Sequence, residues 1–193
     1  MELTTEIIKQ LREKTGVSVM QCKKALEEAN GDLAQAEVIL KKRSAASAEK
    51  KGDREFGAGF IGSYVHEGAI GAMVLLSCET DFVAKNPEFE VLAREIAMQV
   101  AATNPTYLRP EDISEDKKNA AVAVFEKELE GKPEEMKAKI LEGKLASYFS
   151  DQVLSEQPYI KDDSKTIRAL LNEATQKFGE RVEVTQFARF SAR

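Results

Sequence analysis

The chain has 193 residues, 42% of them hydrophobic and 32% charged, which suits one medium domain, or a small domain beside a larger one, with a well-solvated surface. Its formal net charge of −5 argues against a nucleic-acid-binding protein that works by neutralising phosphates. No apolar run approaches the roughly 18 residues of a membrane span. The first residues also lack the pattern of a secretory signal, so we expect a cytoplasmic chain.

Residues 3–48 carry the pattern of three short helices. Ile7, Ile8 and Leu11 recur on one helical face, and the later apolar residues repeat at spacings of three and four. Two glycine-containing turns, each with a residue that can cap the next helix, separate the three segments. The Lys-, Ala- and Ser-rich segment 41–56 is expected to end the third helix and continue as a linker. We therefore predict an N-terminal domain over residues 1–55 and a core domain over residues 56–193.

From residue 57 the hydrophobic pattern becomes that of strands. Residues 60–66 and 70–77 flank a Glu-Gly-Ala turn and predict a β-hairpin, and residues 182–187 predict a third strand. The rest of the core is expected to be helical, over residues 89–103, 111–130, 134–153 with a break near Gly143, and a last helix capped by Asp163 and Ser164. The predicted fold class is therefore α+β, with a small three-stranded antiparallel sheet packed by helices on one side.

A polar segment with one aromatic residue follows the second predicted strand. Residues 78–86 read Cys-Glu-Thr-Asp-Phe-Val-Ala-Lys-Asn. A Phe directly after a strand is usually part of the core, which is one interpretation of Phe82. The other is a projecting wedge, which the neighbouring acids Glu79 and Asp81 favour. Moving Asp81 toward a core would cost free energy unless the carboxylate were paired.

His66 is the only histidine, and a nucleophilic pair could be drawn between it and Cys78. The plainer interpretation makes Cys78 a small core residue and places His66 at the end of the partner strand. One histidine and two widely separated cysteines do not make a zinc site of ordinary composition. The glycines between residues 57 and 71 also lack P-loop spacing. We expect no metal, no cofactor and no enzymatic activity.

Arg12, Val19 and Met20 surround the predicted turn between the first two helices. An exposed methionine beside an arginine makes an adaptable patch for binding another protein. Met20 could equally fill a gap in the core of the bundle, and the pattern alone does not separate these two interpretations.

Two motifs carry a resemblance to a known family. They are Leu-Arg-x-x-Thr-Gly…Cys-Lys-Lys-Ala-Leu, within residues 11–26, and Glu-Thr-Asp-Phe-Val-Ala-Lys, at residues 79–85. With the segments 97–105 and 156–162, they resemble the translation elongation factor Ts family, in order and over essentially the whole chain. The resemblance implies a ubiquitin-associated-like three-helix domain followed by an α+β core.

The resemblance also implies a function. Members of this family are guanine-nucleotide exchange factors that bind the GDP form of elongation factor Tu and promote GDP release by displacing its magnesium ion. GTP then reloads during protein biosynthesis. Carried over by motif, magnesium displacement falls on Thr80, Asp81, Phe82 and Val83, and the contact of the N-terminal domain falls on Arg12, Val19 and Met20. The chain resembles the short form with one core unit, which implies a homodimer in a two-plus-two complex, without nucleic acid or membrane partners.

Two positions depart from the family pattern. Position 19 is often Met in the family and is Val here, and the strand before the wedge reads Leu-Leu-Ser-Cys where Glu-Val-Asn-Cys is common. An alternative function belongs to a different class of protein. In that alternative the three-helix domain binds a polypeptide and the chain does not exchange nucleotides.

Overall fold

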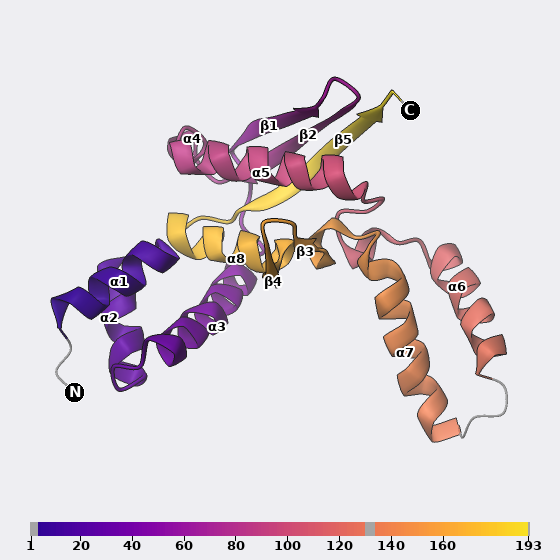
Figure 1. Cartoon of the computed structure of the whole chain (residues 1–193), viewed down its shortest axis with the longest axis horizontal. Helices are drawn as coiled ribbons and strands as arrows, with labels where there is room; N and C mark the ends of the chain where they lie inside the picture. The colour runs from indigo at the N-terminus through magenta and orange to yellow at the C-terminus, as the bar shows by residue number, and fades with distance from the viewer. Residues whose placement is uncertain (1–3, 130–133, 193) are drawn as a thin grey trace.

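The computed structural model describes residues 4–129 and 134–192, and most of their buried hydrophobic residues form two clusters (Figure 1). The N-terminal cluster lies inside α1 (Thr5–Thr15), α2 (Val19–Glu28) and α3 (Leu33–Lys51), which confirms the three predicted helices. Gly16 ends α1 in the left-handed conformation, at φ 67°. The side chains of Ser18 and Asp32 cap α2 and α3 by accepting backbone N–H bonds.

The sheet has three antiparallel strands in the order β1 (Ala58–His66), β2 (Ile70–Cys78) and β5 (Glu183–Ser191). The predicted hairpin between β1 and β2 is confirmed, and both Glu67 and Gly68 have positive φ in its turn. The predicted third strand is also confirmed, and it extends to Ser191. β2 is therefore the central strand of the sheet.

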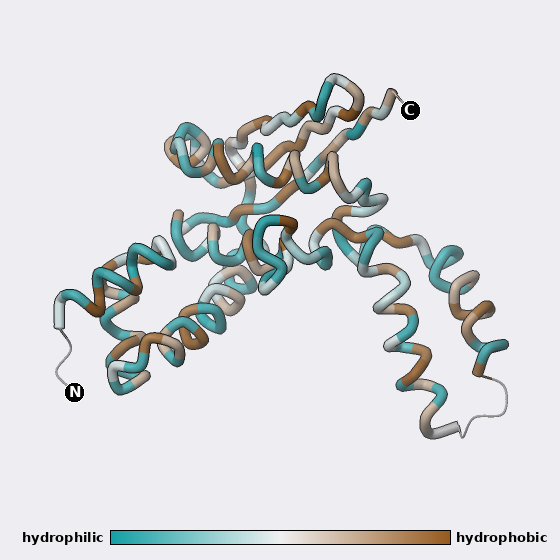
Figure 2. Tube along the Cα trace, in the orientation of Figure 1, coloured by the Kyte–Doolittle hydropathy of each residue, from teal (hydrophilic) through white to brown (hydrophobic). Residues whose placement is uncertain are grey.

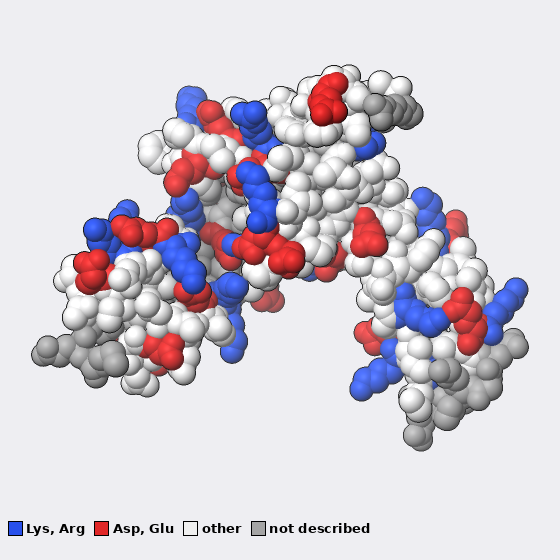
Figure 3. Space-filling view, in the orientation of Figure 1, with Lys and Arg blue, Asp and Glu red and all other residues white. Residues whose placement is uncertain are grey.

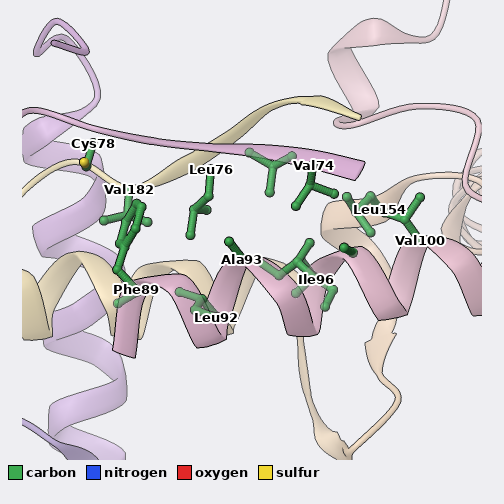
Figure 4. Close-up of a cluster of buried hydrophobic side chains, with 14 of the residues drawn as sticks. Val74, Leu76, Cys78, Phe89, Leu92, Ala93, Ile96, Val100, Leu154 and Val182 are labelled. Carbon is green, nitrogen blue, oxygen red and sulfur yellow. The ribbon is translucent and has the colours of Figure 1, made fainter. Parts of the chain in front are cut away.

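One face of this sheet is covered by α5 (Pro87–Thr103), as expected (Figure 4). From α5, Phe89 points toward Val182, and Ile96 points toward the strand that carries Val74 and Leu76. All five side chains are buried. α5 also lies very close to β1 at Gly62, where a Cβ would be 2.3 Å from the carbonyl carbon of Ala93. Only glycine allows this approach.

Two helices, α6 (Glu115–Glu128) and α7 (Glu134–Ser150), pair side by side and extend away from the sheet (Figure 1). A short 3-10 helix, η1 (Pro110–Asp112), precedes α6 where the predicted helix was to begin. Hydrophobic and hydrophilic residues alternate along both helices (Figure 2). Phe125 and Tyr148 hold the pair together by an edge-to-face contact, with ring centroids 5.6 Å apart. The predicted turn at residues 131–133 lies outside the described residues.

The predicted break near Gly143 is wrong, because α7 runs through this residue without interruption. A single glycine costs a helix about 1 kcal/mol relative to alanine, which a helix with other contacts tolerates. Gly143 has no neighbouring atom within 4 Å of the position of a Cβ. It therefore sits on an open side of α7 and marks neither a turn nor a close contact.

The predicted cap of the last helix is also wrong. This helix, α8 (Ile167–Phe178), is capped by Thr166, whose hydroxyl accepts the N–H of Ala169 at 3.2 Å. Asp162 instead accepts the amide and hydroxyl of Ser164 in a small hairpin that the sequence did not reveal. Its strands are β3 (Pro158–Tyr159) and β4 (Asp162–Thr166), preceded by the 3-10 helix η2 (Leu154–Glu156). No helix among the described residues is long and apolar enough to cross a membrane.

Candidate functional site

The segment after β2 forms a single helical turn, α4 (Asp81–Ala84), whose tip is Phe82. Thr80 caps this turn, since its hydroxyl accepts the N–H of Val83 at 3.4 Å. Val83 and Ala84 are buried in the core, and Asn86 caps α5 immediately afterwards. The side chain of Phe82 is 82% exposed, the largest exposure among the large hydrophobic residues of the described chain. Phe82 therefore projects from the surface, and of the two interpretations of this residue the one that places it in the core is wrong.

Asp81 directly precedes Phe82 and is exposed to solvent. Its carboxylate accepts a hydrogen bond from Lys85 at 2.7 Å. This bond and the positive charge of Lys85 hold the pKa of Asp81 below its usual value. Asp81, whose charge made burial of this segment unfavourable, is thus paired at the surface and ionised at neutral pH.

The base of the wedge is held by the carboxylate of Glu180, which follows α8. One of its oxygens accepts the backbone N–H groups of Glu79 and Thr80, each at 3.0 Å. The other accepts the Thr80 hydroxyl at 2.6 Å. Both oxygens of a single side chain therefore fix Glu79 and Thr80, the two residues that precede α4.

A second set of contacts holds Glu79 itself. The Glu79 carboxylate accepts the backbone N–H of Arg181 at 2.6 Å and pairs with Arg54 at 3.1 Å. The guanidinium of Arg181 donates to the Arg54 carbonyl at 2.6 Å and lies over the ring of Phe56. The connection between α3 and β1 is in this way tied to the base of the wedge.

The other predicted site residues lie at the corner between α1 and α2. Arg12 is exposed in the last turn of α1, and Val19 and Met20 open α2 with exposed fractions of 52% and 63%. Met20 therefore does not fill a gap in the core of the bundle. An exposed Met at such a corner favours a protein-binding patch.

The end of α8 brings this corner close to the wedge. Gln176 donates to the side chain of Gln21 in α2 at 2.8 Å. Lys177 pairs with Glu88, in the first turn of α5, at 2.8 Å, and its Cε lies 3.1 Å from the position of a Cβ on Gly16. Both groups of predicted site residues are thus anchored on one short stretch of chain, residues 176–180.

Comparison with known proteins decides the family. A family model described as Elongation factor TS matches residues 2–193. An Elongation factor Ts from Thermodesulfovibrio yellowstonii is 46% identical over 98% of this chain and 96% of its own length. Those from Coprothermobacter proteolyticus and Thermotoga maritima are 45% and 46% identical, over 99% and 98% of this chain and 98% and 96% of their own. The chain belongs to the elongation factor Ts family.

As a member of the elongation factor Ts family, the chain is a translation elongation factor. The catalytic pair drawn between His66 and Cys78 is wrong, because the register of β1 and β2 places them at opposite ends of the hairpin. Cys78 is fully buried, and its thiol donates to the carbonyl of Thr80 at 3.2 Å. Burial raises the pKa of the Cys78 thiol to about 11. Cys78 is a small core residue at the base of the wedge, as the plainer interpretation had it.

Four residues of this site were missed from the sequence: Arg54, Gln176, Glu180 and Arg181. Each acts on a partner from a distant part of the chain, so no local spacing could have revealed it. Among the described residues no group of three His, Cys, Asp or Glu side chains could hold a metal ion.

Proposed function

We propose that this member of the elongation factor Ts family is a guanine-nucleotide exchange factor for elongation factor Tu. The segment Thr80–Val83 would enter the GTPase beside its nucleotide and displace the magnesium ion, so that GDP leaves and GTP can bind. The observation that carries the proposal is the exposed Phe82 on a turn held from both sides. The factor works in the cytoplasm and performs no covalent chemistry.

Linkage explains how such a factor acts without touching GDP. It binds the nucleotide-free GTPase better than the GDP-loaded one, and by reciprocity it weakens GDP binding by the same factor. Within the wedge, Phe82 and Asp81 are exposed and can reach a partner, whereas Val83 is buried and anchors the turn. The side chain of Phe82 is therefore the part that would enter the GTPase.

A second contact holds the partner while the wedge acts. We assign it to Arg12, Val19 and Met20, which are exposed together at the corner of the three-helix bundle. Separate hydrophobic clusters in the bundle and around the sheet support the division into two domains, residues 1–55 and 56–193. Lys, Arg, Asp and Glu side chains are interspersed over the face seen in Figure 3, which favours a protein partner over nucleic acid.

The uncovered face of the sheet supports a homodimer. Ile61, Val65, Met73 and Phe190 lie on this face, with exposed fractions between 48% and 73%. They are opposite the face that α5 covers, and no charged residue lies between them in the strand register. Exposed apolar patches of this kind mark interfaces between proteins. A twofold pair of such sheets would leave both wedges free to engage two GTPase molecules.

Release of labelled GDP from elongation factor Tu tests the proposal directly. Catalytic amounts of this chain should accelerate the release many-fold, and excess magnesium should slow it again. If this chain bound elongation factor Tu but left the rate of GDP release unchanged, the proposal would be overturned. It would instead favour the alternative in which the bundle binds a polypeptide without exchange.

A further inference from the structure

The wedge is too short to hold its own conformation. α4 has four residues, and isolated helices of even a dozen residues are marginal in water. Buried Val83 and Ala84 fix the far side of the turn, but the near side begins at the exposed residue Thr80. Something outside the turn must therefore hold Thr80.

The contacts of Glu180 meet this need. Its two carboxylate oxygens accept three hydrogen bonds, from the amides of Glu79 and Thr80 and from the Thr80 hydroxyl, at 2.6–3.0 Å. Hydrogen bonds to an ionised carboxylate are shorter and stronger than those between neutral groups. Glu180 itself is fixed, because it stands between Gly179, which ends α8, and Arg181, whose amide and side chain are both bonded. The carboxylate is thus held in place before any partner arrives.

We propose that Glu180 is a positioning residue for nucleotide exchange, which presets the wedge by clamping Glu79 and Thr80, the two residues before α4. Glu180 does not enter the partner. It acts through Phe82, since fixing the segment beforehand removes the cost of ordering it on binding. This inference rests on the proposed function.

A double-mutant cycle tests the inference. We expect Glu180→Ala to slow stimulated GDP release about 10-fold, the scale of a loss of about 1.4 kcal/mol. Glu180→Gln should retain most of the activity, because its amide oxygen can accept the two N–H groups while its NH2 group donates to Thr80. Glu180→Asp keeps the charge but is one methylene too short, so it should behave like Glu180→Ala.

The cycle is completed in the background of Phe82→Ala. There Glu180→Ala should change the rate less than twofold, because the group through which it acts is already gone. Glu173→Ala is the matched control, since Glu173 is a half-buried acid of α8 whose partner is Lys165, away from the wedge. It should exchange like the wild type. An equal loss from Glu180→Ala with and without Phe82, or wild-type rates for both Glu180→Ala and Glu180→Asp, would overturn the inference.

Amide hydrogen exchange of the free protein gives a readout that needs no partner. The amides of Glu79 and Thr80 should lose protection in Glu180→Ala and Glu180→Asp, while the amides of β2 before them keep it. Retained protection at both amides would refute the clamp. The wild-type chain could fail to stimulate GDP release from elongation factor Tu while the amides behave as expected. That result would support the clamp and contradict the proposed function.

Discussion

At the scale of the residue, Phe82 combines a large apolar side chain with nearly complete exposure. Burying a phenylalanine contributes about 1.5–3 kcal/mol, whereas loosening GDP a thousandfold requires about 4 kcal/mol of coupling. Phe82 cannot supply this coupling alone. The rest of the coupling free energy must come from the loss of magnesium contacts in the GTPase and from binding at the corner of the bundle.

Replacing Phe82 by alanine tests this estimate. Phe82→Ala should slow stimulated GDP release by roughly 10- to 100-fold, the range that corresponds to its burial. The fold should stay intact because the side chain makes no core contact, so the thermal midpoint should not fall. Stopped-flow release of labelled GDP and a melting curve measure the two effects. Release at the wild-type rate would eliminate the wedge as the working element.

Cys78 gives a prediction about pH. Its pKa is raised to about 11 in the folded chain, from an ordinary value of 9.0. Below pH 9 the thiol is protonated in both the folded and the unfolded chain, so its burial contributes fully to the free energy of unfolding. Between pH 9 and 11 the unfolded chain ionises first, so the free energy of unfolding falls as the pH rises.

The measurement is the unfolding midpoint of wild type and Cys78→Ala between pH 8 and 11. The wild type should lose stability more steeply than the variant. Cys22→Ala should show a difference in the same direction, because burial raises the pKa of Cys22 as well. Parallel curves for wild type and Cys78→Ala would contradict the assignment.

At the scale of the element, local patterns predicted most of the fold. The hairpin from β1 to β2 and the three helices of the bundle follow from spacings and caps within a few residues of one another. The start of α8 was predicted wrongly because Asp162 and Ser164 bond each other in a hairpin, and a hairpin turn and a helix cap favour the same residue types. Glu180 escaped prediction because Thr80 lies 100 residues away.

The packing of α5 on β1 supplies a test at this scale. Gly62→Ala should destabilise the fold by about 1–3 kcal/mol, because its Cβ would be 2.3 Å from backbone that cannot move without α5. Each kcal/mol should lower the melting temperature by roughly 2–4 °C. Gly71→Ala in β2 is the control, since its nearest atom is a Val65 methyl at 3.8 Å. Equal melting temperatures for the two variants would rule out this account.

At the scale of the whole molecule, the end of α8 joins the two proposed contacts with elongation factor Tu. Gln176 holds the bundle through Gln21, and Glu180 holds the wedge through Thr80. Residues 176–180 therefore help to set the separation between the two proposed contacts, together with the packing of α3 on α8. In the proposed function, the factor would bind elongation factor Tu at the corner of the bundle while Phe82 enters the nucleotide site.

The open face of the sheet makes a prediction about assembly. Met73→Lys places a charge at the middle of this face and should convert a dimer into monomers, because an unpaired charge is costly in an apolar interface. Val38→Lys is the control, since Val38 is a similarly exposed residue of α3, in the three-helix bundle rather than on the sheet. Light scattering during size exclusion gives the mass. A monomeric wild type, or a dimer that Met73→Lys leaves intact, would refute this interface.

The clamp also has a consequence for how the factor is made. The cluster of the bundle uses residues up to Leu40, so this part can fold as soon as it leaves the ribosome. Glu180 and β5 are translated more than a hundred residues later, and only then can they join Thr80 and the central strand. In a nascent chain the corner with Arg12, Val19 and Met20 is therefore folded well before Glu180 can order the wedge. If the proposed function holds, synthesis separates in time the part that would bind the GTPase from the part that would promote GDP release.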